Sequence, residues 1–140
     1  MACGSGILHI FLNDGAALML YAILCYNSEA AIGQWTPEED QAVMTRHEQV
    51  LKGLAMQGKM GPTARLMPTP TAKSVKTSLD KAVIDGPFAE TKEQLLGFYV
   101  VDCESIEEAT EIAKQLSEPP GGTEVRPVHS YWPATIGQKG

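Results

Sequence analysis

His47 and Asp85 are the two side chains whose types and positions suit acid–base chemistry. His47 lies on the apolar side of a predicted helix, and an imidazole gains and loses a proton near neutral pH. Asp85 ends a predicted strand and begins a loop, where functional side chains tend to lie. Its carboxylate could orient His47 and stabilise an imidazolium. We therefore expect the two side chains within hydrogen-bond reach of each other, beside an accessible cavity.

Both residues also have a structural interpretation. A histidine on the apolar face of a helix can be a core residue whose ring nitrogens bond to neighbouring groups. An aspartate that precedes Gly86 and Pro87 forms turns by bonding to its own backbone. The sequence leaves both interpretations open for His47 and Asp85.

Four further side chains are candidates for binding a substrate: Phe88, Glu90, Lys92 and Arg126. Phe88 could hold its loop against the sheet, and Arg126, on the last predicted strand, could bind a carboxylate with two hydrogen bonds. Glu90 and Lys92 would line a pocket mouth or form an exposed ion pair. The spacing of histidines and acids fits no metal site and no glycine-rich loop fits a phosphate, so we expect neither a metal nor a cofactor.

The helix that carries His47 has the clearest start signal in the chain. Thr36 is the expected N-cap, Pro37 is the first helical residue, and Glu39 completes a capping box. The helix should end near Gln57, because Gly58 follows. Its apolar side carries Val43, His47, Val50, Leu51 and Leu54. An apolar run over residues 19–26 predicts a buried strand before it, joined by a loop over 27–34.

The second half of the chain continues with strands and one more helix. Residues 59–71 are irregular or edge-like, 73–77 and 81–84 form a hairpin, and 95–102 is a second buried strand. Ser105 and Glu108 make another capping box, and Pro119 and Pro120 end that helix. A last strand covers 123–131, where Pro127 favours the sheet edge. The order predicts an α+β, ferredoxin-like βαββαβ fold: an antiparallel sheet with both helices on one face.

Composition sets the remaining expectations. The 140 residues suit one domain, and the net charge of −6 argues against binding to nucleic acid or to an anionic membrane. Three separated cysteines (Cys3, Cys25 and Cys103) suit reduced thiols in a cytoplasmic protein. Residues 1–18 are an N-terminal extension or add an edge strand at Ile7–Leu12; that apolar run is too short to span a membrane. The domain covers 19–131, and 132–140 form a C-terminal tail.

A sequence signature follows the predicted hairpin: Asp85-Gly86-Pro87-Phe88-Ala89-Glu90-Thr91-Lys92-Glu93, then Gly97-Phe98-Tyr99. With the strand at 21–26, His47 and the ending Glu124–Pro127, it makes the chain resemble the DGPF members of the YCII-related proteins. The resemblance implies a dimeric α+β barrel with a proposed His–Asp active site in a cavity. The predicted fold also leaves one face of its sheet without helices, and a second copy of the chain that covers this face would give a homodimer.

Two functions fit these observations. The first is a cofactor-free enzyme that uses His47 and Asp85 as an acid–base pair on a small organic substrate, by isomerisation, elimination or hydrolytic dehalogenation. The second is a non-catalytic, stress-linked regulatory or ligand-binding module, which the resemblance associates with an extracytoplasmic-function sigma factor.

Overall fold

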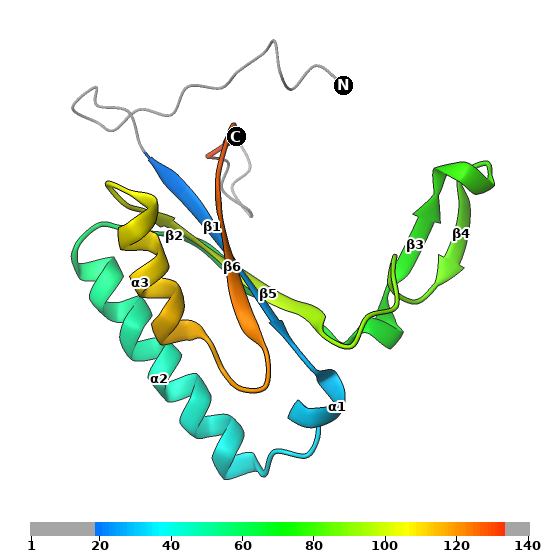
Figure 1. Cartoon of the computed structure of the whole chain (residues 1–140), viewed down its shortest axis with the longest axis horizontal. Coiled ribbons are helices and arrows are strands. Elements are labelled where there is room, and N and C mark those ends of the chain that lie inside the picture. The colour runs from blue at the N-terminus through cyan, green and yellow to red at the C-terminus, as the bar shows by residue number, and fades with distance from the viewer. Residues whose placement is uncertain (1–18, 134–140) are drawn as a thin grey trace, which may run out of the picture.

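The computed structural model describes residues 19–133, which form an antiparallel sheet with two long helices on one face (Figure 1). The sheet order is β2-β5-β1-β6. The strands are β1 (Leu20–Asn27), β2 (Met60–Arg65), β5 (Gln94–Asp102) and β6 (Gly122–Pro127), and the helices are α2 (Pro37–Met56) and α3 (Ile106–Leu116). This arrangement confirms the predicted α+β, ferredoxin-like class.

The core lies between the sheet and the two helices. In the antiparallel pair β1–β5, Tyr21 faces Val101 and Ile23 faces Tyr99, so these side chains share one face of the sheet. They pack against the apolar side of α3, which buries Ala109, Ile112, Ala113 and Leu116. Alternation places the neighbouring residues of β1 and β5, such as Leu24 and Phe98, on the opposite face. Neither long helix covers that face.

The start signals of both long helices are confirmed, one of them in part. Thr36 and Glu39 form the complete capping box of α2. Ser105 caps α3 through the backbone N–H of Glu108, but the Glu108 carboxylate accepts a hydrogen bond from Lys59 instead of closing the box. The loop predicted over 27–34 was wrong in part. Ser28 caps a short helix there, α1 (Glu29–Ile32), because its hydroxyl accepts from the N–H of Ala31.

The predicted hairpin forms, but outside the main sheet. Strands β3 (Lys73–Lys76) and β4 (Ala82–Asp85) pair only with each other and project away from the body in Figure 1. We call residues 73–85 the arm. Two 3-10 turns, η2 (Thr69–Thr71) and η3 (Thr77–Leu79), lie before it and at its tip. The sheet edge is instead β2, which occupies the segment expected to be irregular or edge-like.

The opposite sheet edge is β6, which confirms the position predicted from Pro127. No helix among residues 19–133 is long and apolar enough to cross a bilayer. The expected extension over 1–18, with its alternative strand at Ile7–Leu12, and most of the C-terminal tail lie outside the described residues.

Candidate functional site

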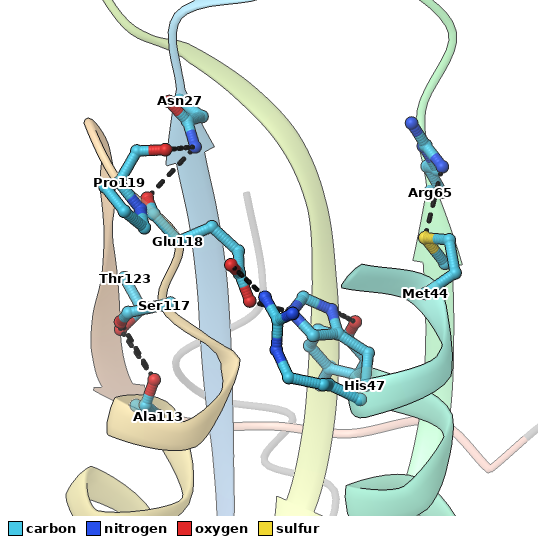
Figure 2. A network of polar contacts seen from close by, with 11 residues as sticks. Asn27, Met44, His47, Arg65, Ala113, Ser117, Glu118, Pro119 and Thr123 are labelled. Carbon is cyan, nitrogen blue, oxygen red and sulfur yellow. Dashed lines mark hydrogen bonds and ion pairs between the residues drawn. The ribbon is translucent and has the colours of Figure 1, made fainter. Parts of the chain in front are cut away.

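His47 is buried on the inner side of α2 and has a hydrogen-bond partner at each ring nitrogen. Its Nδ1 atom lies 3.0 Å from the Tyr99 hydroxyl oxygen, and its Nε2 atom lies 3.0 Å from Oε2 of Glu118. Figure 2 shows the Glu118 carboxylate directed at His47 from the chain segment that follows α3. One imidazole thus joins a carboxylate to a phenol across three separate elements of the fold.

The partners of His47 decide which nitrogen carries the proton in its neutral form. The Glu118 carboxylate also forms an ion pair with Arg46, at 2.5 Å between Oε1 and Nη2, and a carboxylate can only accept hydrogen bonds. The Nε2 atom must therefore hold the hydrogen and donate it to Glu118. The Nδ1 atom is then an acceptor, and the Tyr99 hydroxyl donates to it.

Tyr99 is a protonated phenol at neutral pH. Burial raises the pKa of Tyr99 to about 12, and the nearby Cys25 and Glu118 act in the same direction, while Arg65 lowers it. A free tyrosinate at this position is therefore costly. Tyr99 can release its proton readily only where another group takes it at once, and His47 Nδ1 is placed to do so.

Asn27 fixes the position of Glu118. It is buried at the end of β1, and its side-chain N–H groups donate to the backbone carbonyls of Glu118, at 3.0 Å, and of Pro119, at 3.4 Å. Its own carbonyl oxygen accepts from the N–H of Ser28 at 2.8 Å. Asn27 thereby ties the segment after α3 to the central strand (Figure 2). The Glu118 carboxylate is held where the helix bearing His47 passes.

A cavity of about 380 Å³ opens beside this network, between α2 and the inner face of the sheet. His47, Tyr99 and Glu118 all line it. The rest of its wall is mainly apolar and comes from α1, the segment between α1 and α2, both long helices and the sheet strands, including Ile32, Trp35, Val43, Met44 and Leu51. This volume lies at the small end of the range for ligand pockets. The network therefore faces a space that a small organic molecule can fill.

The hydrogen bond predicted between His47 and Asp85 is wrong for the single chain. Both ring nitrogens of His47 are taken by Tyr99 and Glu118. Asp85 lies at the end of the arm, where its side chain is 81% exposed and forms an ion pair with Lys73. Asp85 is the last residue of β4 and is paired with Lys73, the first residue of β3, at the base of the arm, which is not part of the main sheet. The carboxylate that orients His47 is Glu118.

The other predicted binding residues lie outside the cavity. Phe88 is 70% exposed, and the ammonium of Lys76 lies 3.8 Å above its ring. Glu90 and Lys92 are exposed in the segment that follows. Arg126 pairs with Glu124 on the sheet face that carries no long helix. Binding roles for these four residues stay predictions.

Sequence reasoning missed Tyr99 and Glu118. Tyr99 could have been found from strand alternation, because it faces the same side as Val101 in a strand predicted as central. Glu118 gives no such signal, since it is 71 residues from His47 and in the sequence is only one polar residue just after a predicted helix. Asn27 is an indirect signal for Glu118. A polar side chain buried at the end of an apolar strand needs hydrogen-bond partners, and Asn27 finds one in the backbone carbonyl of Glu118.

Cys25 also lines the cavity, but it is a poor nucleophile. Burial raises the pKa of its thiol to about 11, so the reactive thiolate is scarce at neutral pH. Among residues 19–133, no three histidine, cysteine or acidic side chains are grouped so that they could hold a metal ion. The reactive groups that face the cavity are thus those of the Tyr99–His47–Glu118 network.

Comparison with known proteins gives two findings. The model of the YCII-related domain matches residues 19–131 of the chain. An uncharacterized protein of Rhizobium meliloti (strain 1021) is 47% identical over 122 residues, which cover 84% of this chain and 98% of that protein. The similarity therefore extends over nearly the whole of the described fold.

Proposed function

The chain belongs to the YCII-related family, and we propose that it is a cofactor-free acid–base enzyme for a small organic substrate. The observation that carries the proposal is that His47, a buried imidazole, is held between a carboxylate and a phenol at the wall of an apolar cavity. This is the order of groups in an acid–histidine–hydroxyl triad, with a tyrosine as the hydroxyl.

The arrangement allows proton abstraction as a relay. The Tyr99 oxygen takes a proton from a substrate C–H bond while its own proton passes to Nδ1 of His47. The imidazolium that forms keeps its Nε2–H bond to Glu118, whose negative charge stabilises it. No free tyrosinate forms, which removes the obstacle set by the raised pKa of Tyr99.

Reversal of the relay completes the reaction. If the proton returns to a different carbon of the substrate, the result is an isomerisation. If the substrate carbanion instead expels a leaving group, the result is an elimination, and the imidazolium later loses its proton to solvent through Tyr99. Both need only proton transfer at these three residues.

We propose that the enzyme acts as a homodimer in the cytoplasm. The arm supports the dimer, because a lone two-stranded hairpin is only marginally stable in water. Val75 and Val83 face each other across it and are 54% and 65% exposed. A second copy of the chain would cover this pair and the bare sheet face. Cys25 and Cys103 are free thiols, which suits a reducing compartment.

Deuterium exchange tests the relay without knowledge of the natural substrate. Phenylacetone has weakly acidic C–H bonds next to a carbonyl and a body that suits the apolar cavity. We expect the protein to speed exchange of these hydrogens with D₂O, followed by proton NMR. Loss of any relay group should slow exchange by about 100-fold or more, as in His47→Gln, Tyr99→Phe and Glu118→Gln.

A matched control is Glu111→Gln, an acid-to-amide change on the exposed side of α3, where Glu111 pairs with Lys114. It should exchange at the wild-type rate. If the wild type gives no exchange above buffer, or if His47→Gln exchanges as fast as the wild type, the catalytic proposal fails. The non-catalytic, stress-linked binding module would then be favoured.

A further inference from the structure

Arg65 is the only lysine or arginine among the side chains that line the cavity within residues 19–133. It lies on β2, where Thr63 pairs with Tyr99 and Arg65 pairs with Gly97, two residues earlier on β5. Side chains two residues apart on a strand share one face. Arg65 and Tyr99 therefore stand on the same inner face of the sheet, close enough that the arginine lowers the pKa of the tyrosine.

The guanidinium of Arg65 has hydrogen-bond capacity to spare. Its Nη2 atom donates to Oδ1 of Asp40 at 3.3 Å. Its Nη1 atom donates to the sulfur of Met44 at 3.2 Å (Figure 2). A guanidinium has five N–H donors, and a thioether is a weak acceptor. The Arg65 side chain is also 57% exposed, so its ion pair with Asp40 contributes little to stability.

The acidic side chains that line the cavity are each engaged by a cation of the chain. Glu118 bonds to Arg46 and His47, Glu48 lies 3.8 Å from Lys52, and Asp40 meets Arg65 itself. An incoming cation would have to compete with these partners. A carboxylate entering the cavity could accept two parallel N–H bonds from Arg65, replacing its long hydrogen bond to Asp40 and its weak one to the Met44 sulfur.

We propose that the substrate of this site is a small organic anion, whose carboxylate binds Arg65 and whose apolar body lies along Trp35 and α2. This inference rests on the proposed function and names its substrate class. Trp35, Val43 and Leu51 supply the apolar wall. The carboxylate at Arg65 holds the adjoining carbon atoms next to the Tyr99 hydroxyl, where the relay takes its proton.

Binding of benzoate and of its neutral counterpart benzamide tests the proposal by isothermal titration calorimetry. Both have one ring, and only benzoate carries a charge. We expect benzamide to bind at least about tenfold more weakly than benzoate. Arg65→Gln should weaken benzoate binding by about tenfold or more, and Arg65→Lys should weaken it less, because lysine keeps the charge but not the paired donors.

Asp40→Asn provides an opposite-sign test. It removes the carboxylate that competes for Arg65, so benzoate binding should become tighter. Arg126→Gln is the matched control, since Arg126 is exposed and outside the cavity, and it should bind benzoate as the wild type does. Thermal unfolding of each variant shows that it is folded.

The proposal is overturned if the wild type binds neither compound at millimolar concentration, if it binds both equally, or if Arg65→Gln binds benzoate unchanged. The two proposals fail separately. Arg65-dependent benzoate binding without exchange of phenylacetone or of phenylpyruvate, a carboxylate with acidic C–H bonds next to its ketone, supports the anion site and refutes the relay. Exchange that requires His47, together with benzoate binding that does not depend on Arg65, supports the relay and refutes the anion site.

Discussion

Replacement of Tyr99 by phenylalanine removes one atom from the centre of the network. The hydroxyl oxygen lies 3.0 Å from Nδ1 of His47, which accepts its proton. Without it, a buried acceptor has no donor, and an unsatisfied buried polar group costs about 1–3 kcal/mol. We therefore expect Tyr99→Phe to lower the free energy of unfolding by that amount at pH 7.

The same variant should change how stability depends on pH. The pKa of Tyr99 is raised from 10.0 to about 12 in the fold, so the folded protein keeps this proton after the unfolded chain has lost it. The stability from this group is complete below pH 10 and falls as the pH rises towards about 12. The fall is at most about 2.7 kcal/mol, and smaller because Tyr99 is partly exposed to solvent. Tyr99→Phe has no phenol to titrate, so the unfolding free energies of the two proteins should approach each other above pH 10.

Urea unfolding followed by circular dichroism, at pH 7 and at about pH 11, measures both effects. The Cys25 and Cys103 thiols, whose pKa values are each raised to about 11, add an alkaline loss of stability that both proteins share. Tyr26→Phe is the matched control, because Tyr26 also lines the cavity and its hydroxyl makes no hydrogen bond within residues 19–133. If Tyr99→Phe costs no more than this control, and the difference from wild type is the same at both pH values, the reasoning about the network is refuted.

Three further predictions concern packing, capping and assembly. Gly97→Ala would place a Cβ 2.5 Å from the Ala64 carbonyl oxygen and push β2, with Arg65, away. It should therefore cost about 1–3 kcal/mol of unfolding free energy in urea and weaken benzoate binding. An unchanged affinity for benzoate would contradict this reasoning. Thr36→Ala should lower the unfolding free energy by about 1 kcal/mol, while Thr36→Asp, which restores the cap, should not. Val83→Asp on the arm should turn a dimer into a monomer in sedimentation velocity; a wild type that is itself monomeric would exclude the proposed dimer.

The parts of the fold that the sequence predicted are those encoded by neighbouring residues. The capping box at Thr36 depends on contacts within three residues, and the apolar stripe of α2 depends on a fixed helical period. Both signals hold whatever the rest of the chain does. The short helix α1 escaped prediction because a single Ser28 cap and one turn leave almost no pattern.

The partner of His47 could not be predicted in this way. Asp85 was chosen because it ends a strand within a sequence signature, but the course of the arm depends on the β3–β4 pairing, which takes that strand out of the main sheet. Glu118 reaches His47 only because Asn27 holds the backbone after α3. Such a contact joins three distant segments, and no spacing along the chain reports it.

The proton position on His47 tests the central claim most directly. Long-range ¹H–¹⁵N correlation spectra of the neutral imidazole distinguish a nitrogen that carries hydrogen from one that does not. The network predicts hydrogen on Nε2, directed at Glu118, and a bare Nδ1 that accepts from Tyr99. Glu118→Gln should leave the fold intact but no longer enforce this tautomer. Hydrogen on Nδ1 in the wild type would contradict the relay.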